Sequence, residues 1–187
     1  MSSAPVEMES PLWRFSLAVY RGAGVQEGCL DVQERYGVDV NLLMLCAYVG
    51  AVEGAVLSAS DVEDALDATG GWHADVVRGL RQVRRSLKPL SEAGDFAQVA
   101  GALRLKVKAA ELESEQIEQA MMWTWLRARG ARLPRRDARV ALAANVRALL
   151  VRCGAKGQEA DPLKALPQFC AAALQFDART RATGTGS

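Results

Sequence analysis

The most apolar run of this 187-residue sequence is Leu42-Leu43-Met44-Leu45-Cys46-Ala47-Tyr48-Val49-Gly50-Ala51-Val52. The run is apolar on every side of a helical wheel, which predicts a helix surrounded by other helices rather than one lying on a surface. Asn41 and Glu53 bound it long before the roughly 20 apolar residues that a membrane span requires. We therefore expect a central buried helix over Val40–Val52 and no membrane span.

One side of this expected helix carries almost no side chain. Ala47, Gly50, Ala51 and Gly54 recur at steps of three and four residues, which places them on one helical face. The pattern favours close packing of a second helix against that face. The alternative is a groove for a flat or elongated ligand.

Start and stop signals divide the rest of the chain into helices. Ser10-Pro11 and Asp161-Pro162 each place a side-chain acceptor before a proline, and Asp39 can cap the central helix. Ser60-Asp61-Val62-Glu63 fits a capping box, and no segment alternates with period two between turn residues. The chain is predicted to be all-α, with about seven helices. The helical segments are expected near residues 10–22, 25–36, 40–52, 60–70, 72–87, 96–129 (one helix, or two broken near Ala109), 134–152 and 162–176.

Composition fits one soluble globular domain, with 50% hydrophobic and 24% charged residues. We expect an N-terminal tail at 1–9, a single helical domain at 10–177 and a flexible C-terminal tail at 178–187. The chain opens without a secretion signal, and its four cysteines form no C-x-x-C pair: Cys29, Cys46, Cys153 and Cys170. These features predict reduced, packed thiols and a cytoplasmic location.

The small net charge of +1 conceals a strong segregation of charge along the chain. Residues 1–70 hold three bases against eleven acids, a net charge of −8, whereas residues 127–156 hold nine bases against one acid, a net charge of +8. These two regions either neutralise each other inside the fold or face partners outside it.

The sequence carries the pattern L-W-x-F-S-L-x-V-Y at residues 12–20 and G-x-D-V-N-L-L at residues 37–43. Together with a later segment, 106–119, these patterns resemble a proteobacterial family of small conserved helical proteins of unknown function. The resemblance implies a bacterial origin. It assigns no activity and no functional residue.

The sequence lacks the residues that several common catalytic and metal sites require. His73 is the single histidine, which cannot supply the two Glu-x-x-His motifs of a di-iron bundle, and the cysteines lack zinc spacing. No G-x-S-x-G elbow, P-loop or dinucleotide glycine pattern occurs. We expect no catalytic residue, no metal site and no cofactor, with His73 as a capping or surface residue at a helix start.

Acidic residues gather at helical spacing in two segments. The first set is Asp61, Glu63, Asp64 and Asp67, and the second is Glu111, Glu115 and Glu118. The first set resembles the magnesium-binding motifs of isoprenoid synthases, with Asp64 and Asp67 as the candidate clasp, although the helix dipole and solvent also account for acids in a first turn. We interpret the second set as a solvated face or as partners for the protein's own arginines.

Six arginines fall within thirteen residues that span an expected helix end, a glycine turn and a helix start: Arg127, Arg129, Arg132, Arg135, Arg136 and Arg139. This outline resembles a helix-turn-helix, and arginines at a helix N-terminus suit phosphate. The cluster is therefore a candidate anion-binding or nucleic-acid-binding site, unless the acidic first 70 residues neutralise it internally.

Polar residues inside the apolar N-terminal region are a further clue, because buried charges need partners. They predict either an internal network of ion pairs and caps or a pocket with a polar floor for a ligand or a partner's peptide. The candidate residues are Trp13, Arg14, Tyr20, Arg21, Asp31, Gln33, Asp39, Asn41, Gly50 and Gly54.

These patterns predict a non-catalytic binding or adaptor protein of the bacterial cytoplasm that acts through protein–protein interaction, with another protein as its partner. The prediction rests on the lack of a catalytic set, on the charge segregation and on tryptophans available as contacts: Trp13, Trp72, Trp123 and Trp125. One alternative is a nucleic-acid or ribosome-associated factor that uses the arginine cluster 127–139. The other is a magnesium-dependent small helical enzyme.

Overall fold

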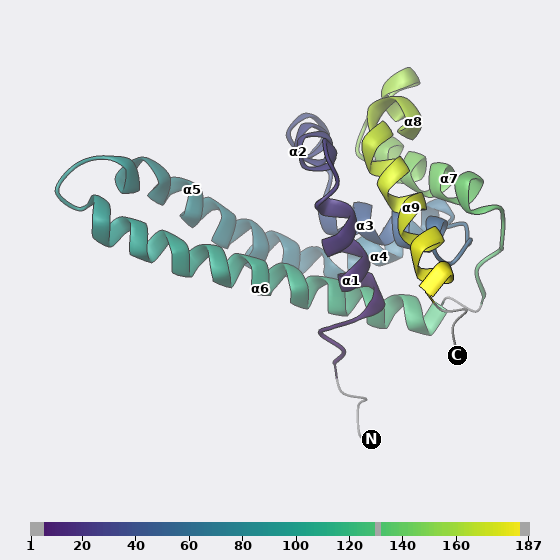
Figure 1. Cartoon of the computed structure of the whole chain (residues 1–187), viewed down its shortest axis with the longest axis horizontal. Coiled ribbons are helices and arrows are strands. Elements are labelled where there is room, and N and C mark those ends of the chain that lie inside the picture. The colour runs from purple at the N-terminus through teal and green to yellow at the C-terminus, as the bar shows by residue number, and fades with distance from the viewer. Residues whose placement is uncertain (1–5, 130–131, 184–187) are drawn as a thin grey trace.

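The computed structural model describes residues 6–129 and 132–183, with side chains through residue 176. Over these residues the secondary structure is helical apart from one isolated bridge between Ala55 and Arg135, so the expected all-α class is confirmed. The helices form a body from which a two-helix arm projects (Figure 1). In chain order they are α1 (Pro11–Tyr20), α2 (Val25–Tyr36), α3 (Val40–Ala51), α4 (Ala59–Trp72), the π-helical turn η1 (His73–Val77), α5 (Arg78–Glu92), α6 (Ala97–Arg129), α7 (Ala138–Arg152), the 3-10 turn η3 (Gly157–Ala160), α8 (Pro162–Ala165) and α9 (Pro167–Thr183).

The helix α3 lies at the centre of the body, as its composition predicts. Every residue from Asn41 to Ala51 is buried, and the surrounding core includes side chains of α1, α6, α7 and α9. The ring of Tyr48 contacts Phe15 and Trp123 edge to face, with centroids 5.5 and 5.9 Å away. The small-residue face around Gly50 lies against α7, so it serves helix packing and forms no groove.

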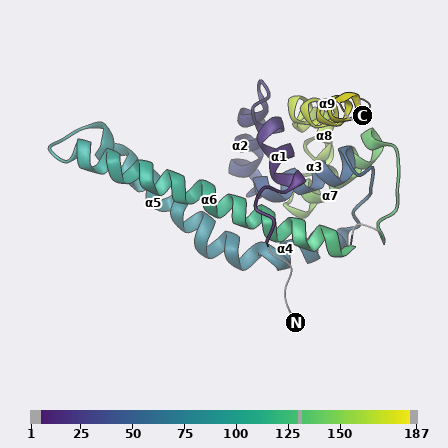
Figure 2. The same cartoon turned by 60° about the horizontal axis from the view of Figure 1, so that its bottom comes forward.

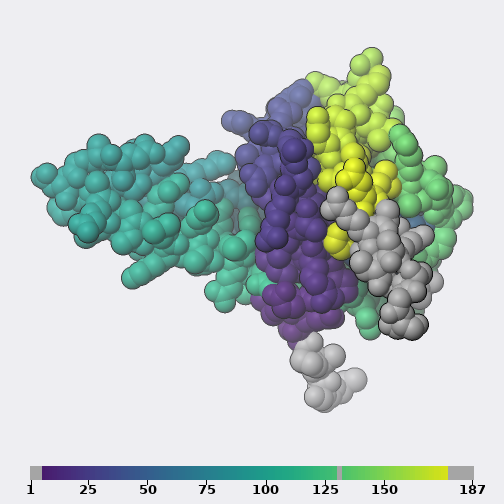
Figure 3. All heavy atoms as spheres, viewed as in Figure 1, coloured from purple at the N-terminus to yellow at the C-terminus, as the bar shows by residue number. Residues whose placement is uncertain are grey.

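The arm consists of α5 and the first half of α6, which run side by side away from the body (Figures 1 and 2). The space-filling view shows the arm as a projection that extends well beyond the body (Figure 3). None of the α5 residues is buried, and the buried residues of α6 begin only at Glu111. Two helices alone cannot enclose an apolar seam, which explains the exposure.

Both ends of α4 differ from the sequence prediction. The capping box is built by Ser58 and Asp61, two residues earlier than expected, because the hydroxyl of Ser58 accepts from the Asp61 N–H while the Asp61 carboxylate accepts from the Ser58 N–H. The predicted stop at Gly70 and Gly71 is wrong. Glycine disfavours a helix by only about 1 kcal/mol, and packing of α4 and α5 on α6 carries the helix through.

Two prolines lie elsewhere relative to the helices than the expected ranges place them. The range 72–87 puts Pro89 beyond a helix end, and the range 134–152 puts Pro134 at a helix start. Pro89 lies inside α5, which continues to Glu92, one turn before the tip of the arm. Pro134 does not start α7, which begins at Ala138 with Asp137 as its cap. The reason is that 134–136 pairs with 54–56, where Val56 N–H donates to the Pro134 carbonyl at 2.9 Å.

The helix expected over 162–176 is divided at Leu166 into α8 and α9, and most other boundaries follow the sequence signals closely. Ser10 and Asp39 cap α1 and α3 through their side chains, and α6 is one helix without a break near Ala109. Of the tails expected at 1–9 and 178–187, residues 178–183 continue α9, and 1–5 and 184–187 lie outside the described residues. Within the described part of the chain, no helix has the length and apolarity to cross a membrane.

Candidate functional site

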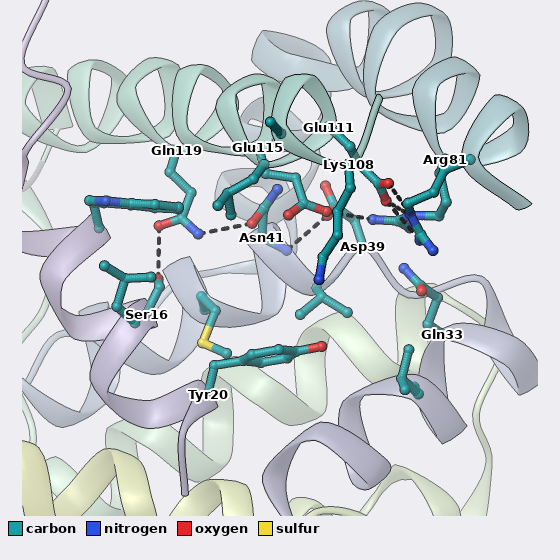
Figure 4. Close-up of a pocket in the computed structure, with 18 of the residues that line it drawn as sticks. Ser16, Tyr20, Gln33, Asp39, Asn41, Arg81, Lys108, Glu111, Glu115 and Gln119 are labelled. Atoms are coloured by element: carbon teal, nitrogen blue, oxygen red, sulfur yellow. Dashed lines mark hydrogen bonds and ion pairs between the residues drawn. The ribbon is translucent and has the colours of Figure 1, made fainter. Parts of the chain in front are cut away.

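Two adjacent clefts lie where the arm meets the body. The first, of about 540 Å³, is bounded by α1, α2, α5 and α6 (Figure 4). The second, of about 780 Å³, is bounded by α2, α4, α5 and α7. Gln33, Asp39 and Arg81 line both, so the two clefts meet at the N-terminus of α3. Their sizes are those of ordinary ligand sites.

A chain of buried hydrogen bonds runs along the inner wall of the first cleft, which Ser16, Asn41 and Gln119 line. Ser16 Oγ donates to Gln119 Oε1 at 2.8 Å, and Gln119 Nε2 donates to Asn41 Oδ1 at 2.8 Å (Figure 4). Asn41 Nδ2 donates in turn to Glu118 Oε2 at 2.6 Å. The side chain of Glu118 has no exposed surface. Because each side chain supplies a hydrogen-bond partner for the next, the network fixes one arrangement of these side chains.

The chain ends at His73, which lies between two carboxylates. Its Nδ1 is 3.0 Å from Glu118 Oε1 and 3.4 Å from Asp39 Oδ2. Burial, together with the charge of Glu118, raises the pKa of Asp39 to about 7. Burial acts to lower the pKa of His73, but the hydrogen bond to Glu118 and the charge of Asp39 outweigh it and raise this pKa. His73 is thus a largely buried part of the network, not the surface residue that its sequence position suggests.

The backbone at His73 departs from a regular α-helix. Residues His73–Val77 form a π-helical turn between α4 and α5, which keeps the two helices continuous. Such turns are rare and occur often at functional sites. Beside it, Trp72 Nε1 donates to the Ser114 carbonyl of α6 at 2.9 Å, which holds this turn against α6.

Arginines of α5 form one wall of both clefts. Arg81 binds Glu111 and Glu115 of α6, with its terminal nitrogen 2.8 Å from the Glu115 carboxylate, and Arg84 also binds Glu111. The interpretation of the acidic set as partners for the protein's own arginines fits Glu111 and Glu115. It is wrong for Glu118, which is buried and bound by Asn41 and His73. The described residues offer no ion pair to three further cations that line the clefts, namely Arg78, Arg85 and Lys108.

The structure separates the residues that the sequence grouped as one pocket or polar network. Five of them line the first cleft: Trp13, Tyr20, Gln33, Asp39 and Asn41. Arg14, Arg21 and Asp31 are exposed, and Asp31 pairs with Arg35 on its own helix. Gly50 and Gly54 instead lie against residues of α7 and the segment before it.

The arginine cluster is split between paired and unpaired members. Arg129 binds Asp61 and Asp64, and Arg135 binds Glu53, so the acidic region neutralises these two internally. Arg127 stacks on Trp123 at 5.8 Å from the ring centroid. No ion pair within the described residues involves four exposed members of the cluster: Arg127, Arg132, Arg136 and Arg139.

Of the two acids predicted as a magnesium clasp, Asp64 is engaged by an arginine, whereas Asp67 forms no ion pair within the described residues. Asp64 Oδ2 is 2.7 Å from Arg129, and Glu63 binds Arg152. The expected tryptophan anchors are also largely used internally. Trp13 and Trp123 are each 7% exposed, and Trp123 Nε1 donates to Glu7.

Sequence reasoning missed Ser16, Glu118 and Gln119 as members of the site and gave His73 no partner. Glu118 and Gln119 adjoin the apolar run 120–123 of α6, and polar residues at the edge of an apolar run were the available signal. No sequence pattern near Glu118 and Gln119 links them with Asn41 or His73, because these side chains meet only when α3, η1 and α6 pack together.

The fold and site define a small all-α protein with paired clefts at the base of a helical arm. The chain belongs to the family described as "Protein of unknown function (DUF2390)", which matches residues 11–122. The resemblance to a family of unknown function is therefore confirmed, and the match includes every residue of the buried polar chain. No curated protein and no solved structure matches the sequence.

Proposed function

We propose that this protein is a non-catalytic binding protein of the adaptor type, and that its arm and the first cleft hold an acidic, amphipathic segment of another protein. The observation that carries the proposal is the arm itself, a helical hairpin whose α5 has no buried residue. Exposed apolar surface gathered on one element is typical of an interaction site.

Apolar side chains of the arm support a protein partner. Five of them along the hairpin are about half exposed or more: Val83 (48%), Leu90 (58%), Phe96 (75%), Val99 (64%) and Leu103 (49%). Near the base, Leu105 and Leu112 of α6 reach the first cleft opposite Leu30 of α2. An amphipathic helix that fills such a groove contributes the third element that the hairpin lacks.

The positive charge of the arm favours a negatively charged partner. Residues 78–108 hold eight bases and only two acids, Glu92 and Asp95, a net charge of +6. A second copy of the arm carries the same charge and is repelled, whereas an acidic segment is attracted. Arg85 and Lys108 lie at the first cleft without an ion pair among the described residues and are available to such a partner.

The proposal includes a bacterial cytoplasmic location. It is supported by the four free cysteines, three of them buried, because a reducing compartment keeps thiols in this state. Burial raises the pKa of Cys29, Cys46 and Cys170 to about 12, so these three thiols are inert packing groups.

The test is a titration of the whole protein into a fluorescent synthetic peptide that forms an acidic amphipathic helix, followed by anisotropy. We expect saturable binding that weakens with salt and is lost in Phe96→Ser with Arg85→Glu. Arg147→Glu, an exposed site on α7, is the matched charge control and should bind normally. Equal binding of a scrambled peptide, or none at low salt, contradicts the proposal.

A second candidate is nucleic-acid binding through the arginine cluster, favoured by its four exposed, unpaired members. Phosphate contacts make such binding strongly dependent on salt. RNA binding that disappears in the double variant Arg132→Glu, Arg136→Glu, together with no peptide binding, would favour this candidate. Arg14→Glu on α1 is its control, because this exposed arginine lies outside the cluster.

A further inference from the structure

Asp39, His73 and Glu118 bring three metal-ligating atoms together from three distant segments of the chain. Asp39 caps α3, His73 starts the π-helical turn, and Glu118 lies in the middle of α6. One oxygen of each carboxylate and Nδ1 of the imidazole all lie within 4.8 Å of one another. Among the described residues this is the one such group of three.

The spacing of these atoms suits coordination of one ion. Ligands about 2.1 Å from a tetrahedral ion stand about 3.4 Å apart, and cis ligands of an octahedral ion about 3.0 Å apart. His73 Nδ1 lies 3.4 Å from Asp39 Oδ2 and 3.0 Å from Glu118 Oε1. Two of the three ligand–ligand distances thus match a coordination sphere as they stand, and the third, between the two carboxylate oxygens, is within 4.8 Å.

Hydrogen bonds from Asn41 orient the carboxylates of Asp39 and Glu118 toward His73. Its backbone N–H donates to Asp39 Oδ1 at 2.9 Å, and its side-chain amide donates to Glu118 Oε2 at 2.6 Å. The opposite oxygens, Asp39 Oδ2 and Glu118 Oε1, are the two that face His73. Hydrogen bonds that hold the outer atoms of ligands are typical of metal sites, since they fix ligand orientation.

The charge of the cluster also favours a cation. Metal binding displaces protons from its ligands, and the deprotonated cluster of two carboxylates and a neutral imidazole carries a charge of −2. The side chain of Glu118 has no exposed surface. Arg81, which lines both clefts beside Asp39, is bound by Glu111 and Glu115 and does not pair with this cluster in the structure. A divalent ion would neutralise this charge, and the second cleft, which Asp39 and His73 line, would give it access to the site.

We propose that Asp39, His73 and Glu118 form a binding site for a single divalent transition-metal ion. One nitrogen and two oxygen ligands suit Zn²⁺, Mn²⁺ or Fe²⁺, whereas Mg²⁺ and Ca²⁺ prefer oxygen alone. The metal site does not require the partner proposed for the arm, because its three ligands are held by the N-terminus of α3, by η1 and by the middle of α6.

The first test is calorimetric titration of tag-free, chelator-treated protein with Zn²⁺, with Mg²⁺ as the comparison ion. We expect one Zn²⁺ per chain, much weaker Mg²⁺ binding and a higher melting temperature with Zn²⁺. Glu118→Gln should weaken Zn²⁺ binding by at least roughly 10- to 100-fold. Asp75→Asn, an exposed acid two residues from His73, should leave it unchanged.

A second measurement stays valid if the Glu118 variant folds poorly. Because the chain has a single histidine, wild-type protein labelled at histidine gives one set of imidazole resonances. Zn²⁺ should shift these resonances at one equivalent, and Mn²⁺ should broaden them. Cys153→Ser tests the thiol that lines the same cleft. Unchanged imidazole resonances, or Zn²⁺ binding lost in Cys153→Ser and kept in Glu118→Gln, would overturn the proposal.

Discussion

Gly50 of α3 lies directly against the backbone of Leu142 in α7, so closely that a Cβ on Gly50 would stand 2.4 Å from the Leu142 Cα. No rotamer change relieves this contact, because both partners are backbone. The approach of α3 and α7 therefore depends on the missing side chain, which explains why glycine stands at this position of the small-residue face.

Gly50→Ala should accordingly destabilise the protein by about 3 kcal/mol or more, at or above the upper end of overpacking effects. Gly79→Ala in α5 is the matched control, because nothing lies within 4 Å of its Cβ position. That change should stabilise by about 0.5 to 1 kcal/mol, since alanine favours a helix over glycine. Urea unfolding of both variants measures the difference, and similar stabilities would contradict the packing argument.

Asn145 of α7 ties down the loop that follows α3. Its side chain donates to the carbonyls of Cys46 and Ala55 at 3.2 and 2.9 Å and accepts from the Leu57 N–H at 2.8 Å. Asn145→Leu removes the side-chain partner of the Ala55 carbonyl and of the Leu57 N–H, two buried loop groups, at about 1 to 3 kcal/mol each. We expect a loss of about 3 kcal/mol or more in chemical unfolding.

The control for this substitution is Arg147→Ala, an exposed position on the same helix, which should change stability by less than about 0.5 kcal/mol. Equal effects of the two substitutions would show that Asn145 does not hold the loop.

The parts of the fold that the sequence predicts are those governed by local rules. The buried helix follows from the unbroken apolar run 42–52, and the starts of α1 and α3 follow from the caps Ser10 and Asp39. The stop predicted at Gly70 failed because packing against α6 outweighs the small penalty of a helical glycine. Local propensity cannot reveal a helix that neighbouring elements hold together.

The candidate site was predictable only in its N-terminal half. Asp39 and Asn41 stand out as polar residues beside an apolar run, and both line the first cleft. His73 and Glu118 do not stand out, because their meaning comes from contact across 45 residues of chain. A histidine without a nearby ligand motif gives no sign of the two carboxylates that packing brings to it.

Glu111 links α6 to the arginines of α5, and its contribution should depend on pH. Burial acts to raise its pKa, but the hydrogen bonds from Arg84 and Arg81 outweigh this and hold the pKa below its ordinary value of 4.5. The folded state then binds fewer protons than the unfolded state, so the stabilisation is present above pH 4.5 and is lost as pH falls through the lowered pKa.

At pH 7, Glu111→Gln should therefore be less stable than wild type by about 1 to 3 kcal/mol, and thermal melts should show this gap closing well below pH 4.5. Glu113→Gln, an exposed glutamate two residues away, should differ little from wild type at either pH. A gap that persists in acid would mean that Glu111 acts through packing rather than charge.

The exposed arm should open independently of the body. All α3 residues but Val40 are buried, whereas α5 has no buried residue and contains Pro89, which lacks the N–H for one helical hydrogen bond. Hydrogen exchange should therefore be slow in α3, where it requires global unfolding, and much faster in α5, where local opening suffices. Val83→Ala should speed exchange in the arm and leave α3 unchanged. If α5 exchanged as slowly as α3 in the isolated chain, the hairpin would be part of one cooperative unit, and the argument that it lacks a third element would fail.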